Sequence, residues 1–125
     1  MKILSINQII NLHEILIKKF GGIRGFRDEK LLESSINSAF QTFNFIDLYE
    51  GKLKKIIHIT YSIIKNHPFI DGNKRVATHV MLILLELNEY KIDYLQSELI
   101  LLILDLASSK KEEKDLLKWV QNHLI

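Results

Sequence analysis

Two long apolar runs on either side of the only proline, Pro68, constrain the fold of this chain more than any other feature. The run before the proline, residues 53–65, repeats its apolar side chains at the i, i+3, i+4 spacing of one helix face. The run after it, residues 74–88, is apolar nearly all round, which is typical of a central helix packed on several sides. The residue before a proline disfavours helical angles, so the first run must end there. We therefore predict two buried helices joined by a short turn.

Capping signals in the first part of the chain predict two more helices and a loop. A first helix, capped by Ser5 or Asn7, should run to about Phe20 and stop at the two glycines that follow. Asp28 is a good N-cap for a second helix. Residues 21–27 between these helices alternate and contain three glycines, so we expect a loop or a small hairpin there.

The remaining segments complete the predicted helices. Three aromatic residues, Phe40, Phe43 and Phe45, should anchor to the core the connection that leads into the first central helix. After the central helices, Ser97 can cap a further helix. The Ser-Lys-Lys-Glu stretch at residues 109–112 has the spacing of a capping box that opens the last helix.

Length and composition set the class of protein. With 125 residues, 47% of them hydrophobic, and one proline, we predict an all-α fold: one compact bundle of about six helices, forming a single domain over residues 1–125. The absence of cysteine excludes disulfides and thiolate zinc sites. No apolar run reaches the about 18 residues of a membrane span, and the first residues lack a signal-peptide core, so we expect a cytoplasmic protein without a membrane partner. A net charge of +2 without a basic stripe argues against direct nucleic-acid binding.

The turn between the two central helices concentrates residue types that perform chemistry. It comprises residues 67–75, His-Pro-Phe-Ile-Asp-Gly-Asn-Lys-Arg. A histidine such as His67 can act as a general base toward a hydroxyl group, although a lone histidine is more often a capping or core residue. Asp71 can ligate a hard cation such as Mg²⁺, or it can favour the start of the next helix through the helix dipole.

The residues after Asp71 predict an anion site at a helix N-terminus. Gly72 permits positive φ and a close approach of a ligand, and the backbone N–H groups of Gly72, Asn73 and Lys74 have no helical acceptor. Lys74 and Arg75 place two positive charges where they oppose the helix dipole, unless a polyanion binds there. Solvated surface charges are the alternative. The combination of a base, a carboxylate and an anion site at a helix N-terminus indicates phosphoryl or nucleotidyl transfer.

The nine residues of this turn resemble the signature loop of the Fic/Doc family. They are most similar to its Doc (death-on-curing) branch, the toxins of two-gene toxin–antitoxin modules. Residues 25–35, Gly-Phe-Arg-Asp-Glu-Lys-Leu-Leu-Glu-Ser-Ser, and residues 84–88, Leu-Leu-Glu-Leu-Asn, extend the resemblance. Family members that transfer AMP carry glycine at the position of Lys74 and a second arginine at the position of Thr78, so both departures point to the Doc branch.

The resemblance implies a reaction and a role for each matching residue. In the Doc branch ATP is bound in a reversed sense, and the γ-phosphoryl group is transferred to a threonine hydroxyl of elongation factor Tu, which halts translation. On this basis His67 is the base and Asp71 the Mg²⁺ ligand. The Gly-Asn pair at residues 72–73 shapes the anion cradle, while Lys74 and Arg75 hold the ATP phosphates.

The resemblance also implies two protein contacts. Residues 21–27 correspond to the family's flap, which holds the target segment by strand-like pairing. Its target-binding residues would be Gly22, Ile23, Arg24 and Gly25. The inhibitory Ser/Thr-x-x-x-Glu-Gly/Asn helix that many members carry has no match, because Ile46 stands at the Ser/Thr position before Glu50. The implied inhibitor is therefore a separate antitoxin, whose C-terminal segment folds into a groove beside the ATP site.

Other functions stay open at this stage. AMP transfer at the same site is one alternative, although the missing second arginine counts against it. A helical binding module without catalysis is another. Metal-dependent hydrolysis, with His58 or His79 joining the turn, is disfavoured because the chain has no His-Asp dipeptide or His-Glu-x-x-His pair. DNA binding is weaker still, since no recognition helix with flanking basic residues is visible.

Overall fold

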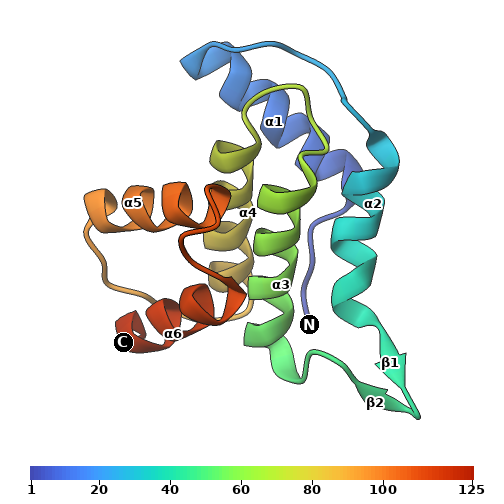
Figure 1. The fold of residues 1–125 in the computed structure, drawn as a ribbon, viewed down its shortest axis with the longest axis vertical. Helices are drawn as coiled ribbons and strands as arrows, with labels where there is room; N and C mark the ends of the chain where they lie inside the picture. The colour runs from blue at the N-terminus through green and yellow to red at the C-terminus, as the bar shows by residue number, and fades with distance from the viewer.

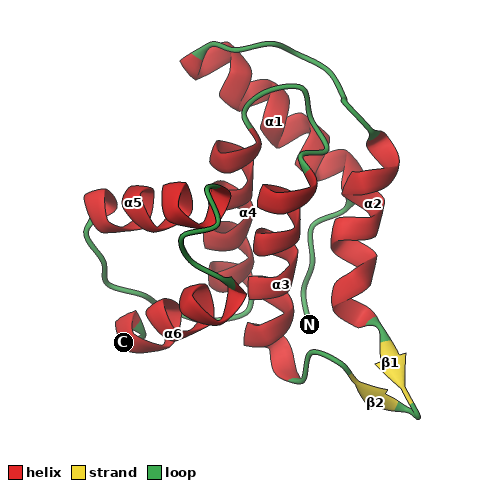
Figure 2. Cartoon of the chain, in the orientation of Figure 1, coloured by secondary structure: helices red, strands yellow, loops and turns green.

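The computed structural model, which describes residues 1–125, is a bundle of six α-helices (Figure 1). They are α1 (Ile6–Phe20), α2 (Glu29–Asn37), α3 (Gly51–Asn66), α4 (Asn73–Leu87), α5 (Gln96–Ala107) and α6 (Glu113–His123). A single 3₁₀ turn, η1 (Ser38–Phe40), continues α2, and two short antiparallel strands follow, β1 (Thr42–Phe43) and β2 (Ile46–Asp47). Everything outside this hairpin is helix or loop (Figure 2), so the predicted all-α bundle is confirmed.

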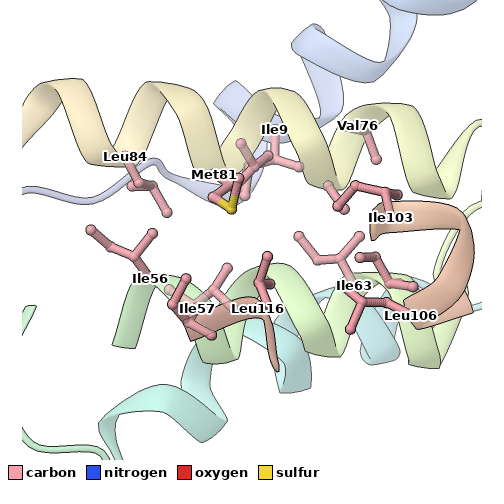
Figure 3. Packing of buried hydrophobic residues seen from close by; sticks show 14 of the residues in the cluster. Ile9, Ile56, Ile57, Ile63, Val76, Met81, Leu84, Ile103, Leu106 and Leu116 are labelled. Carbon is pink, nitrogen blue, oxygen red and sulfur yellow. The ribbon is translucent and has the colours of Figure 1, made fainter. Parts of the chain in front are cut away.

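The two helices predicted to be central form the middle of the bundle. Helices α3 and α4 run side by side, with α2 packed on α3, α1 on α4, and α5 and α6 closing the remaining side (Figure 1). Their facing side chains, such as Ile56, Ile63 and Met81, are fully buried, and Leu106 and Leu116 approach them from α5 and α6 (Figure 3). All but one of the buried hydrophobic side chains, Ile17 being the exception, belong to one cluster of 23 residues. This continuous core holds the turn between α3 and α4 in place.

The first two helices begin and end where the local signals predicted. The Ser5 hydroxyl accepts a hydrogen bond from the Gln8 backbone N–H at 3.1 Å, and the Gln8 side chain accepts one from the Ser5 N–H at 2.8 Å, which makes a complete capping box. Gly21, at φ +84°, ends α1. The Asp28 side chain caps α2 by accepting from the Lys30 N–H at 3.0 Å.

The two caps predicted for the last helices were wrong. Helix α5 starts directly after Leu95, ahead of Ser97, because its exposed first turn can leave its N–H groups to water. Helix α6 is capped by Glu112, whose N–H donates to the Asp115 carboxylate at 2.7 Å. Ser109 instead lies just after the end of α5, where it has φ +66°, and its hydroxyl accepts a hydrogen bond from Lys65.

The prediction that aromatic residues anchor the 40–50 connection to the core was also wrong. Phe43 and Phe45 are 70% and 103% exposed, and Phe40 lies at the surface as well. Asn44 and Phe45 both have positive φ, as a type I′ two-residue turn requires, so the strands fold into a hairpin that projects from the bundle (Figure 2). Because this turn faces solvent, its apolar side chains have nothing to pack against.

The segment 21–27 is a loop without a hairpin of its own. It is held instead by an isolated antiparallel bridge between Phe26 and Phe69 in the turn that follows α3. None of the helices combines the length and apolar character required to cross a membrane.

Candidate functional site

The backbone leaves α3 at His67, in a conformation that turns the chain sharply. His67 has φ +49° and ψ +60°, in the left-handed region that few non-glycine residues occupy. Pro68 disfavours right-handed helical angles at the residue before it, so α3 ends here, and the left-handed conformation of His67 closes the helix as its C-cap. The His67 side chain is exposed, and its imidazole makes no hydrogen bond within the protein. The imidazole is therefore accessible to a bound molecule.

Gly72 starts α4 and could be no other residue without strain. It has φ +75° and ψ +16°, and a Cβ atom there would lie 3.3 Å from Ile17 Cδ1 and 3.5 Å from His13 Nε2. Backbone hydrogen bonding in α4 begins with the Val76 N–H, which donates to the Gly72 carbonyl at 3.0 Å. The N–H groups of residues 73–75 consequently have no acceptor in the protein, which leaves a helix N-terminus ready for an anion. The Gly72 N–H, by contrast, donates to Asp71.

Asn73 supports the turn with its side chain. It is 5% exposed, and its amide makes two hydrogen bonds to the backbone of Phe69. Oδ1 accepts from the Phe69 N–H at 3.0 Å, and Nδ2 donates to the Phe69 carbonyl at 2.9 Å. Only its backbone N–H remains for a ligand. The Asn73 side chain therefore fixes the backbone of the turn and is not available to a ligand.

The Asp71 carboxylate joins the turn to the flap. Its Oδ2 accepts the Ile23 N–H at 3.1 Å, and its Oδ1 accepts the Gly72 N–H at 2.8 Å. The hydrogen bond from Ile23, followed by that from Gly72, lowers the pKa of Asp71 from its usual 3.8, and the positive charge of Lys74 adds to this. The carboxylate is thus ionised at neutral pH. One exposed carboxylate fits the way Mg²⁺ binds nucleotides, where phosphates and water complete the coordination.

The flap is tied to the turn by backbone hydrogen bonds. The Gly25 carbonyl accepts the Ile70 N–H at 3.1 Å, and the Pro68 carbonyl accepts the N–H groups of Arg27 and Asp28. Gly22 packs so closely on Asp71 that a Cβ atom would lie 2.9 Å from its Oδ2. The structure therefore brings the predicted flap residues against the predicted site.

Arg24 is the flap residue that points elsewhere. Its guanidinium forms an exposed ion pair with Glu14 on α1, at 3.3 Å. Such a pair contributes little to stability, because water screens both charges. Arg24 can therefore leave Glu14 for another partner at small cost.

Lys74 and Arg75 lie exposed in the first turn of α4, as predicted. Thr78, one turn later, carries no charge, and its hydroxyl donates to the Lys74 carbonyl at 2.7 Å. Burial, the charge of Arg75 and then that of Lys19 lower the pKa of His79 from its usual 6.5. His79 is therefore mainly neutral at neutral pH, and the positive charge near the turn comes from lysine and arginine.

His13, a residue that the sequence reasoning missed, lies directly under the turn. It is 2% exposed, donates from Nε2 to the Asp71 carbonyl at 2.8 Å, and stacks on Phe69 with ring centroids 3.8 Å apart. The available signal was its place on the apolar face of α1, between Ile9 and Leu16. A histidine on such a face needs a polar partner within the fold.

Arg27 is a second missed residue. Its Nε donates to the His67 carbonyl at 2.7 Å, and its Nη2 donates to the Asn66 carbonyl. It thereby satisfies the last carbonyl groups of α3 and braces the backbone that carries the imidazole. No sequence signal identifies this, because the cation comes from a segment 39 positions away.

The alternative metal-hydrolysis site does not assemble. His58 donates from Nδ1 to the Glu113 carboxylate on α6 at 2.7 Å and stacks on Tyr49, so it belongs to a separate polar contact. No three His, Asp or Glu side chains lie close enough together to hold a metal ion by themselves. A cation at Asp71 would therefore depend on the ligand for most of its coordination.

Comparison with known proteins agrees with this arrangement. The model of the Fic/DOC family matches residues 3–85, which include the flap, α3, the whole turn and most of α4. The match covers more than half of the chain, and the protein belongs to the Fic/DOC family. No curated protein matches the chain.

Proposed function

We propose that this Fic/DOC protein is an ATP-dependent protein kinase of the Doc branch and the toxin of a type II toxin–antitoxin module. Its substrate would be a threonine hydroxyl of elongation factor Tu, and its effect the inhibition of translation. One observation carries the proposal. Within residues 67–75 the fold juxtaposes an imidazole without a partner, an ionised carboxylate and a helix N-terminus that carries two cations.

The proposed reaction follows from these groups. His67 takes the proton of the threonine hydroxyl, whose oxygen attacks the γ-phosphorus of ATP. The bond between that phosphorus and the oxygen bridging to the β-phosphate breaks, and ADP leaves with the electron pair. The N–H groups of residues 73–75, with Lys74 and Arg75, stabilise the phosphate charge. When bound at Asp71, Mg²⁺ supplies further neutralisation of the phosphates.

The choice between phosphoryl and AMP transfer rests on two positions. Lys74 and Thr78 depart from the pattern of AMP-transferring members, and the Thr78 hydroxyl is engaged by the Lys74 carbonyl. This supports ATP bound with its γ-phosphate at the acceptor. Incubation with elongation factor Tu and ATP labelled at the α or the γ position tests the proposal. We expect only the γ label on the factor, and transfer of the α label alone would refute the kinase and favour AMP transfer.

The proposed partners are a target segment on the flap and an antitoxin near the ATP site. The flap is fixed to the turn at Gly25, while the backbone N–H and carbonyl of Arg24 make no hydrogen bond within the protein, which supports strand-like binding of a target there. Expression in bacteria should arrest growth, and co-expression of a short neighbouring reading frame should relieve the arrest. Toxicity that survives His67→Ala would remove His67 as the base.

A further inference from the structure

Phe20 is an exposed aromatic residue whose place the hydrophobic core does not explain. It is the last residue of α1 and is 51% exposed. The Arg75 guanidinium carbon lies 4.3 Å from the centroid of its ring, and the Lys19 ammonium lies at 5.4 Å. Both distances are within the about 6 Å of a cation–π contact, and the arginine contact is the closer. The ring therefore joins the end of α1 to the first turn of α4.

We propose that Phe20 is a positioning residue that holds the Arg75 guanidinium beside the phosphate site through this contact. The inference rests on the proposed function, because it requires Arg75 to bind a phosphate of ATP. It adds to that function a residue outside the 67–75 turn. The contact comes from α1, so the helix that carries His13 under the turn also sets the orientation of a charge above it.

Arg75 needs such a support because nothing else in the protein holds it. Its guanidinium makes no ion pair and no hydrogen bond within the chain. It also lies where the helix dipole and the neighbouring Lys74 are unfavourable for a cation. An unrestrained arginine loses rotamer entropy when it binds a ligand. A contact that restricts the side chain beforehand reduces that loss.

An aromatic ring is suited to this task in a way that a carboxylate is not. A carboxylate partner would occupy guanidinium N–H groups and neutralise the charge. A ring beneath the guanidinium uses its π face and leaves the N–H donors free for phosphate oxygens. The lowered pKa of His79 agrees with this geometry, because after burial its causes are Arg75 and Lys19, the two cations on the Phe20 ring.

Binding of Mg²⁺-ATP to three forms of the full chain tests the inference. By isothermal titration calorimetry, Phe20→Leu should weaken binding about two- to fivefold, the effect of an exposed cation–π contact. Phe20→Tyr keeps the ring and should restore the affinity of the unaltered protein. Phe45→Leu is the matched control, since it is the same change at a ring 103% exposed in the hairpin, and it should have no effect. Unchanged affinity in Phe20→Leu, or equal losses in the leucine and tyrosine variants, would overturn the inference.

Two further measurements separate this inference from the proposed function. In NMR spectra without nucleotide, the Nε–Hε signal of Arg75 should be shifted by the ring in the unaltered protein and in Phe20→Tyr, and should move to its free position in Phe20→Leu. An identical signal in all three would overturn the contact even if ATP binds. Absence of ATP binding by the unaltered protein would instead refute the proposed function. Against an Arg75→Ala background, Phe20→Leu should cost no further affinity, and a persisting loss would contradict a role through Arg75.

Discussion

Replacing Asn73 by alanine should destabilise the whole fold, because the amide is a structural brace of the turn. The change leaves the Phe69 N–H and carbonyl without partners, and Phe69 is 1% exposed, so water cannot easily replace the amide. Each buried group without a partner costs about 1–3 kcal/mol. The two together predict a loss of about 2–6 kcal/mol, which is a large part of the about 5–15 kcal/mol that stabilises a typical domain.

Urea unfolding followed by circular dichroism measures this loss. The midpoint should fall while the slope m stays constant, since the variant keeps the same core. Asn11→Ala is the matched control: Asn11 is exposed on α1 and its side chain makes no hydrogen bond, so the midpoint should change by less than the equivalent of about 0.5 kcal/mol. Asn73→Asp keeps an acceptor for the Phe69 N–H but turns a carboxylate toward the Phe69 carbonyl, so it should also lose stability.

The opposite result would refute the reasoning. If Asn73→Ala were no less stable than Asn11→Ala, the two hydrogen bonds to Phe69 would not support the turn. The Asn73 amide would then be assigned to the ligand, and the variant should lose affinity for ATP at unchanged stability. Measuring both quantities on the same preparation separates the two roles.

Other perturbations test the base, the carboxylate and the core. His67→Asn should lower phosphoryl transfer about 10²–10⁴-fold at an unchanged urea midpoint, because asparagine tolerates left-handed angles and the imidazole has no partner; a retained rate would exclude His67 as the base. The pKa of Asp71 is lowered from 3.8, first by the Ile23 N–H, so its contribution to stability is present above that pH and is lost as pH falls through the lower folded value. As the pH falls, the urea midpoint of the unaltered protein should therefore decrease more than that of Asp71→Asn. A difference between the two midpoints that does not change with pH would contradict this. Ile63→Ala, at a side chain 0% exposed, should cost about 2–5 kcal/mol by urea unfolding, against less than about 0.5 kcal/mol for Ile100→Ala at 53% exposure, and equal costs would contradict the assigned core.

Local features of the sequence were sufficient to predict most of the helices. The apolar spacing of residues 53–65 and 74–88 depends only on helix geometry. The caps Ser5 and Asp28 are also local, because each bonds to a residue at most three positions away. The caps predicted at Ser97 and Ser109 were wrong, because α5 starts after Leu95 with a first turn exposed to water and the Glu112–Asp115 pair caps α6. The prediction that Phe40, Phe43 and Phe45 anchor to the core was wrong because a phenylalanine is buried only where the fold provides a surface to cover it.

The sequence by itself determined which chemical groups the turn contains, because all nine residues are contiguous and Pro68 and Gly72 direct the backbone locally. Only the tertiary structure decided how those groups are used. It turned the Asn73 amide inward, brought His13 and the flap against Asp71 and placed Phe20 on Arg75. Apart from the contact of the Asn73 amide with Phe69, these contacts join segments that lie 48 or more positions apart. They exist because α1 packs on α4, and such packing depends on the whole core rather than on any local pattern.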